Sequence, residues 1–243
     1  MATIETEPTT IESKPAATET RRRDRAPRIG PQSAGLRMTV EEFDALPPSR
    51  FVKGYRYEVI RGVLIVSPSP GPGERGPNDE LGYLLRQYHE THPQGSVIDD
   101  TLPEQTVSAT HRRRADRVIW VGLGRVPDEL SDIPAIVIEF VSSRRRDAVR
   151  DYEEKRDEYL AAGVKEYWII DRFRRVMTVY RKGLAGPTYD IVTETQSYET
   201  GLLPGFVLPL SRLLAKADDW TRARRQRRDN KTKPTPPAGG TDG

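Results

Sequence analysis

The most apolar stretch of the chain contains a glutamate, which is the first candidate for chemistry. Residues 133–141 read IPAIVIEFV, and Glu139 stands near the end of this run. Its β-branched composition predicts a strand buried on both faces. An ionised carboxylate inside such a strand is costly unless it is paired with a cation or holds a metal ion. We therefore expect Glu139 to have a positively charged partner.

A second carboxylate, Asp116, belongs to the preceding apolar run, RADRVIWV at 114–121. Side chains alternate along a strand, so Asp116 and Glu139 approach each other from one face if the two strands are neighbours. Two close carboxylates repel each other, and a divalent cation relieves that repulsion. The alternative is that each acid pairs with a nearby arginine such as Arg114 or Arg117.

A lysine lies on the apolar side of a predicted helix at 147–162, which ends before Gly163. Lys155 precedes Tyr159 by four residues and so falls on the same stripe. A lysine in that position must either extend to solvent or meet an acid. It converges with the two carboxylates if the helix packs on their sheet, but an ordinary pair with Asp151 on the helix surface is the alternative.

Glu58, within YEVIRG at 57–62, is a third candidate acid. The alternation from 55 to 66 around Arg61-Gly62 predicts a hairpin, and Glu58 then lies either at the site or on the hairpin's solvent side. Two arginine triplets lie close to these acids in the sequence. They are predicted either to contact the phosphates of a polyanion near the acids or to be solvated charge on loops. They comprise Arg112, Arg113, Arg114, Arg144, Arg145 and Arg146.

Composition narrows the kind of metal that the chain can hold. There is no cysteine, and there are three histidines, which excludes thiolate sites and makes a histidine site improbable. Oxygen ligands favour Mg²⁺ or Mn²⁺. No apolar run is long enough to span a bilayer, and no secretory signal is recognisable at the start. We therefore expect a cytoplasmic protein that does not associate with a membrane.

The net charge of +3 is unevenly distributed along the chain. Residues 31–215 carry 25 Lys/Arg against 27 Asp/Glu, whereas residues 216–243 carry eight against four. Polar, low-complexity composition predicts a disordered tail at 1–35 and a basic disordered tail at 216–243, with one domain at 36–215 between them.

The domain reads as an α+β fold with a mixed sheet and helices packed against it. A capping box at Thr39 predicts a short helix, and an apolar stripe predicts another at 78–91. The SPSPGPG segment at 67–73 is expected to stop any regular element. Besides the hairpin, strands are expected near 96–99, 104–108, 116–121, 134–141, 164–171, 175–181 and 188–193.

Several short segments, in this order, resemble the Uma-two family of restriction-type endonucleases, a branch of the PD-(D/E)XK nuclease superfamily. The similarity extends over about 38 to 214. It is carried by YEVIRG at 57–62, RAD at 114–116, VIEFVS at 137–142, DYEEK at 151–155, GVKEYWIID at 163–171 and LPGF at 203–206.

The resemblance implies a restriction-endonuclease-like fold and a metal site. Asp116 and Glu139 would hold Mg²⁺, together with the carbonyl of Phe140, and Glu58 would be an additional acid. The superfamily lysine usually follows the second acid by two residues, where this chain has Val141. In this family the lysine is expected on the following helix, as Lys155.

The expected function is therefore metal-dependent hydrolysis of DNA phosphodiester bonds. A catalytically silent module for nucleic-acid binding or protein interaction on the same fold is the alternative. DNA is the expected partner, and a homodimer would suit a double-strand cutter.

Overall fold

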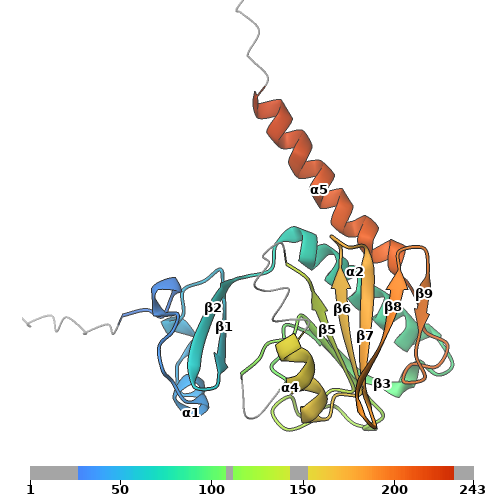
Figure 1. Cartoon of the computed structure of the whole chain (residues 1–243), viewed down its shortest axis with the longest axis horizontal. Coiled ribbons are helices and arrows are strands. Elements are labelled where there is room, and N and C mark those ends of the chain that lie inside the picture. Colours follow the sequence, from blue (N-terminus) through green and yellow to red (C-terminus); the bar gives the residue numbers. More distant parts are fainter. Residues whose placement is uncertain (1–26, 108–111, 143–152, 233–243) are drawn as a thin grey trace, which may run out of the picture.

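A six-stranded mixed sheet forms the centre of the computed structural model, which describes residues 27–107, 112–142 and 153–232 (Figure 1). Strands β5 and β6 are parallel, and every other neighbouring pair in this sheet is antiparallel. The order across the sheet is β3 (Ile98–Pro103), β4 (Arg117–Val121), β5 (Ile136–Phe140), β6 (Glu166–Asp171), β7 (Val176–Gly183) and β8 (Gly186–Thr193). The predicted α+β fold is confirmed.

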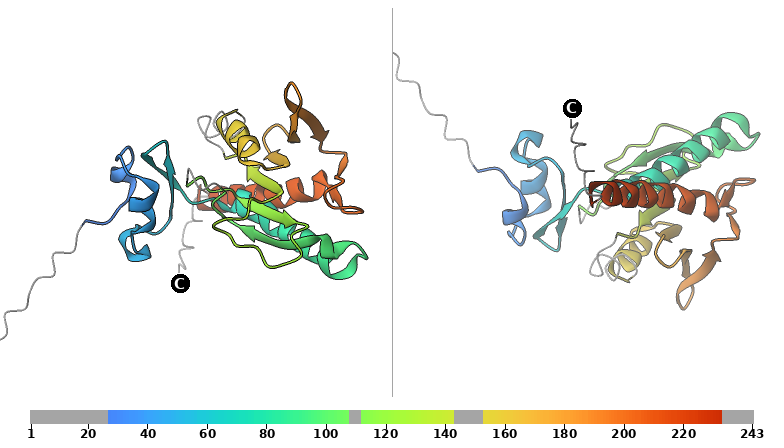
Figure 2. Two further views of the ribbon diagram at one scale, coloured as in Figure 1. Left: turned by 90° about the horizontal axis from the view of Figure 1, so that it is seen from below. Right: turned by 90° about the horizontal axis from the view of Figure 1, so that it is seen from above.

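Helices cover both faces of this sheet (Figures 1 and 2). On one face, α2 (Pro72–Thr91) and the first turns of α5 (Leu210–Thr232) pack against Ile138 and its neighbours. On the other, Tyr159 of α4 (Lys155–Ala162) packs beside Val137. Because parallel strands require a crossover, the chain between β5 and β6 must leave the sheet, and α4 lies on that connection. β5 and β6 are consequently buried along their whole length.

A small lobe precedes the sheet. Its hairpin joins β1 (Tyr55–Ile60) to β2 (Val63–Pro68) through Arg61 and Gly62, both with positive φ, which is the geometry of a tight two-residue turn. Helix α1 (Val40–Asp44) begins at the Thr39 capping box. The predictions of this hairpin and this helix start are therefore confirmed.

The remaining regular elements are short. The strands β9 (Ser197–Glu199) and β10 (Val207–Pro209) pair with each other, and the part of the chain that the structure describes also has three 3₁₀ turns. The turns are η1 (Pro31–Ser33), η2 (Pro48–Arg50) and η3 (Gly95–Val97). Within the described ranges, no helix has the length and apolar character needed to span a bilayer.

The predicted N-terminal tail is wrong for its last residues. The described chain starts at residue 27, and Ile29 is buried with Val59 and Leu64 in the lobe's own small core. The Ile29 amide also donates to the carbonyl of Arg50. One apolar side chain in a polar stretch and backbone hydrogen bonds to the rest of the lobe anchor this segment. Residues 1–26 lie outside the described residues.

The predicted C-terminal tail is also wrong over much of its length, because α5 continues to Thr232. Leu210, Leu213 and Ala217 are buried against α2 and the sheet, which anchors the first turns. The following residues are rich in arginine and contain no glycine or proline, so the helix continues. The run of charged residues was interpreted as a disordered tail, and this interpretation is wrong for the residues of α5. Residues 233–243 lie outside the described residues.

Helix α2 begins six residues earlier than predicted, at Pro72. The proline-rich segment does not stop it, because proline at the first helical position has the required φ and lacks an N–H that would be unsatisfied there anyway. The strand expected at 104–108 is reduced to a bridge between Thr106 and Arg114. The first part of the helix expected at 147–162 lies outside the described residues up to 152.

We predict that Leu213→Ala lowers the free energy of unfolding by about 2–5 kcal/mol, because Leu213 is fully buried between α5 and the sheet. Leu184→Ala is the matched control, since Leu184 is fully exposed in the turn after β7. It should change stability by less than about 0.5 kcal/mol. Urea unfolding measures both, and an equal effect of the two variants would contradict the packing of α5.

Candidate active site

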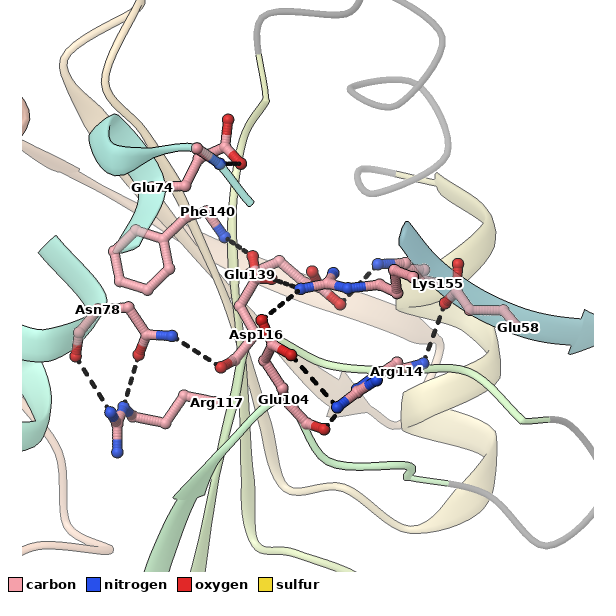
Figure 3. Close-up of polar contacts among 12 residues, drawn as sticks. Glu58, Glu74, Asn78, Glu104, Arg114, Asp116, Arg117, Glu139, Phe140 and Lys155 are labelled. Atoms are coloured by element: carbon pink, nitrogen blue, oxygen red, sulfur yellow. Dashed lines mark hydrogen bonds and ion pairs between the residues drawn. The ribbon is translucent and has the colours of Figure 1, made fainter. Parts of the chain in front are cut away.

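Asp116 and Glu139 lie close together at one end of the sheet. The β4–β5 register pairs Arg117 with Ile138, which brings Asp116, just before β4, beside Glu139 of β5. Cross-strand partners project from the same face of a sheet. Both residues are buried, and Figure 3 shows their side chains side by side. The structure thus confirms the predicted proximity, while their metal-binding role stays a prediction.

Asp116 is held by contacts on all its oxygen atoms. Its Oδ1 accepts a hydrogen bond from Arg56 at 2.6 Å, and its Oδ2 accepts one from the Phe140 amide at 2.7 Å. The backbone carbonyl accepts from Asn78 Nδ2 at 2.8 Å. Phe140 therefore contributes its N–H to the site, and the expected use of its carbonyl as a metal ligand remains untested.

Glu139 meets the lysine that the sequence analysis singled out. Lys155 Nζ lies 2.6 Å from Glu139 Oε1, and both side chains are at most 2% exposed. Tyr159 Oη donates to the same oxygen at 3.2 Å. Lys155 is the first residue of α4, so the helix directs this ammonium group into the sheet face that carries both acids. Of the two alternatives considered for Lys155, meeting a buried acid is confirmed.

Arg56 on β1 is a site residue that the sequence analysis missed. Burial disfavours its charge, but Asp116, Glu139 and Glu58 outweigh this and raise the guanidinium pKa above its ordinary value. Its Nε is buried and finds no hydrogen-bond acceptor among the described residues. The signal available in the sequence was its spacing of two from Glu58, which places both on one face of the hairpin.

Glu58 is buried rather than on the solvent side of the hairpin. Its Oε1 accepts a hydrogen bond from the Arg114 amide at 3.0 Å. The polar face of β1 therefore points toward the segment that leads into β4, as the Glu58–Arg114 contact shows (Figure 3). Glu58 also adds a third carboxylate to the charges that act on Arg56.

Arg117, considered as a partner for the acids, instead bonds to Asn78 of α2. Its Nε donates to Asn78 Oδ1 at 2.7 Å and its Nη2 to the Asn78 carbonyl at 3.2 Å (Figure 3). Burial lowers the pKa of Arg117 to about 10, against the opposing effect of Asp79. It remains charged at neutral pH, and it connects α2 to the start of β4.

The predicted nucleic-acid contact is wrong for Arg113. Its side chain is 1% exposed and forms ion pairs with Glu158 on α4 and with Glu154. An arginine enclosed in this way stabilises the packing of α4 and has no access to a polyanion.

The other members of the triplets have different outcomes. Arg112 forms a bidentate pair with Asp44, and Arg114 pairs with Glu104 at 3.2 Å. Their contact with nucleic acid stays a prediction. The second triplet, 144–146, lies outside the described residues.

The acids open into a cavity of about 1120 Å³, called the site cavity below. Arg56, Asp116, Glu139 and Lys155 line one side of it. Its other walls come from the start of α2, the turn after β6 and the α5 segment 220–229. A buried charge cluster that opens into a cavity of this size is a common feature of active sites.

Glu74, in the first turn of α2, is a second residue of the cavity that the sequence analysis missed. Its Oε2 accepts a hydrogen bond from the Gly71 amide at 3.2 Å. Burial raises its pKa above the ordinary value and Asp116 adds to the rise, whereas the Gly71 amide, Arg172 and Arg56 act in the opposite direction. The available signal was a glutamate three residues after the glycine that precedes a Pro-initiated helix.

The acid pair has the oxygen donors that a hard divalent cation prefers. Among the described residues, no three Asp, Glu, His or Cys side chains are grouped as a complete metal site. Mg²⁺, however, is usually held by one or two carboxylates, with waters and substrate phosphates completing its shell. Asp116 and Glu139 supply such a pair, beside a guanidinium whose Nε has no acceptor among the described residues.

Residues 40–211 match the model of the Uma2 family, described as "Putative restriction endonuclease". The match covers well over half of the chain, and this protein belongs to that family.

A solved structure, described as a "putative nuclease" from Anabaena variabilis, is similar to this one with a TM-score of 0.59 and 15% sequence identity. The similarity covers 74% of this chain and 99% of that chain, which supports the fold. No curated protein matches the chain.

We predict that Glu74→Gln becomes more stable relative to wild type as the pH rises from about 4 to 7 in the presence of a chelator. A raised pKa means that protonated Glu74 favours folding below the unfolded-state value of about 4.3, and this contribution is lost as the pH rises through the higher folded-state value. Glutamine does not titrate. Chemical unfolding across this range measures the difference.

Glu90→Gln in the same helix supplies the baseline for loss of a surface carboxylate, since Glu90 is exposed. A Glu74→Gln difference that stays constant with pH, once this baseline is subtracted, would contradict the raised pKa.

Proposed function

We propose that this protein is a metal-dependent endonuclease that hydrolyses DNA phosphodiester bonds at the Asp116, Glu139 and Lys155 cluster. The observation that carries the proposal is that these three buried charges, from two adjacent strands and one helix, line a single open cavity. Membership of a family described as "Putative restriction endonuclease" supports the same reaction.

The reaction replaces one phosphorus–oxygen bond by another. A water oxygen attacks phosphorus, the bond to the leaving sugar oxygen breaks, and that oxygen takes up a proton. Asp116 and Glu139 would hold Mg²⁺ or Mn²⁺, which when bound supplies positive charge beside the phosphate and lowers the pKa of a coordinated water. The protein's part is to bring the phosphate, the water and the acids together.

Lys155 and Arg56 have distinct positions in this arrangement. Lys155 places its ammonium group against Glu139, where it would orient the attacking water or stabilise charge on the phosphate. Arg56 reaches Asp116 from the small lobe, and its Nε is a buried donor without an acceptor among the described residues. Arg56 also lines the site cavity, so its guanidinium is proposed to contact the scissile phosphate.

Glu58 is proposed as a positioning residue. It holds the amide of Arg114 and acts electrostatically on Arg56, so it supports the cation that meets Asp116. A role as a further metal-binding acid, implied by the family resemblance, remains a proposal, as does homodimerisation.

A second candidate is a catalytically silent module in which the same charges form a structural network. One observation favours it: Asp116 and Glu139 already have cationic partners, Arg56 and Lys155, at 2.6 Å each. Buried ion pairs of this kind also occur without catalytic function. Metal binding distinguishes the two candidates, because a structural network has no use for a cation.

We predict that Asp116→Asn, Glu139→Gln and Lys155→Met each slow Mg²⁺-dependent nicking of supercoiled plasmid by on the order of 100-fold or more. Glu194→Gln is the control, because Glu194 pairs with Arg175 away from the site cavity. It should cut like wild type. Equal nicking by all preparations would assign the activity to a contaminant and remove the nuclease proposal.

We also predict that the protein binds Mn²⁺ in calorimetric titration and that the double variant Asp116→Asn, Glu139→Gln does not. Arg56→Gln should bind Mn²⁺ more tightly than wild type, since it removes a cation that pairs with the same carboxylate. Absence of Mn²⁺ binding by the wild-type protein would favour the structural network.

A further inference from the structure

The C-terminal half of α5 is a basic wall of the site cavity. Residues 216–232 contain seven Lys/Arg against three Asp/Glu, and the cavity-lining arginines Arg224, Arg225 and Arg227 are exposed. Figures 1 and 2 show this half of the helix extending beyond the sheet toward the side that carries hairpin β1–β2. The family match ends at residue 211, so this wall lies beyond the part shared with the family model.

Two exposed aromatic side chains line the same cavity. Trp220 on α5 is 47% exposed, and Phe173 in the turn after β6 is 54% exposed. The Arg172 guanidinium lies over the Phe173 ring, 4.5 Å from its centroid. Aromatic and guanidinium planes in a basic groove stack on the bases of single strands, whereas the base faces of an intact duplex are covered by their neighbours.

Arg172 adds an independent sign of a missing acceptor. Its Nε is buried and has no hydrogen-bond partner among the described residues. The guanidinium lies against Gly73 at the start of α2, where an added Cβ would come within 2.2 Å of its Nη1. Arg172 therefore brings a positive charge to the start of α2, where it lines the site cavity.

The start of the basic wall packs on α2. The Trp220 indole lies against Gly76 of α2, where a Cβ would come within 2.9 Å of Nε1. Arg212 at the start of α5 pairs with Glu80 of α2 at 2.6 Å. Helix α2 also carries Glu74, so the wall and the site cavity share one rigid support.

We propose that the α5 segment 220–229 and the Arg172–Phe173 turn bind a nucleic-acid strand that leads into the acid site, so that the substrate is DNA with unpaired bases. The α5 arginines and Arg172 would contact phosphates, while Trp220 and Phe173 stack on bases. This inference rests on the proposed function for cleavage, but strand binding itself does not require cleavage.

The test is fluorescence anisotropy of the full chain with a labelled single strand and with the matching duplex, in EDTA so that nothing is cut. The single strand should bind several-fold more tightly than the duplex. Arg224→Gln with Arg227→Gln should weaken binding and reduce the slope of log K against log salt by ~1.4, or ~0.7 for each phosphate that the protein no longer neutralises. Arg222→Gln is the matched control.

Arg222 suits this purpose because it lies on the same helix, pairs with Asp219 and does not line the site cavity. Its variant should bind as wild type does. If the double variant binds like the Arg222 variant, or if the duplex binds as tightly as the single strand, the proposal is overturned.

Stacking is tested by Trp220→Leu and Phe173→Leu, each of which should weaken single-strand binding roughly five-fold or more, with a smaller effect on duplex. Polyglutamate should compete weakly, because it has charge but no bases. Equal competition by polyglutamate, or unchanged binding by both leucine variants, would make the wall a general polyanion surface and overturn the assignment. Thermal melting confirms that each variant is folded.

The failure of strand binding and the failure of cleavage are distinguishable. Asp116→Asn should bind the single strand in EDTA at least as tightly as wild type, because it removes a negative charge from the same cavity, while losing plasmid nicking. If the protein binds the single strand through α5 but does not nick plasmid, this inference is supported and the proposed reaction is removed. If the protein nicks plasmid but the α5 double variant binds the single strand as wild type does, the proposed reaction is supported and this inference is removed.

Discussion

Two carboxylates are buried side by side at the end of a central strand pair, and the structure compensates their charge from several directions. Asp116 and Glu139 would repel each other strongly in a medium that excludes water. Arg56 from the lobe and Lys155 from α4 each place a cation 2.6 Å from one of them. Either acid, if buried without a cation, would lower the free energy of unfolding, whereas the two acids and two cations together form a neutral cluster.

This compensation determines how the elements meet. Helix α4 packs on β5 and β6 through Tyr159, and its first residue is the lysine that reaches Glu139. Hairpin β1–β2 presents one apolar face to its own core and one polar face to the segment before β4. Helix α2 fixes the Asp116 carbonyl through Asn78. The site is thus assembled from parts far apart in the chain.

Local pattern predicted the acid pair and its lysine well. Alternation along two apolar runs placed Asp116 and Glu139 on one face, and the helical stripe placed Lys155 toward the sheet. Arg56 and Glu74 could not be found in this way, because each reaches the site through the docking of a separate element. The hydrophobic pattern predicted most of the sheet, while it missed α2's start, where a proline begins the helix.

Charge was the least reliable guide to structure. Arg113 belongs to a run that reads as surface charge, yet it is enclosed by Glu158 and Glu154. The arginines after residue 220 read as a tail, yet they continue a helix anchored by Leu213 and Leu214. Arginine is both charged and a good helix former, so composition alone does not separate these outcomes.

The lobe has a hydrophobic core of its own, centred on Ile29, Val59 and Leu64, and its contacts with the β4 segment are largely polar. Dissolved ions screen such attachments but leave apolar packing intact, and they act most on pairs with an exposed partner, such as Arg112–Asp44. A higher ionic strength therefore weakens the attachment of the lobe to the six-stranded sheet, because each of the two parts has its own hydrophobic core. Arg56, one of the two cations beside the acid pair, belongs to the lobe and moves with it.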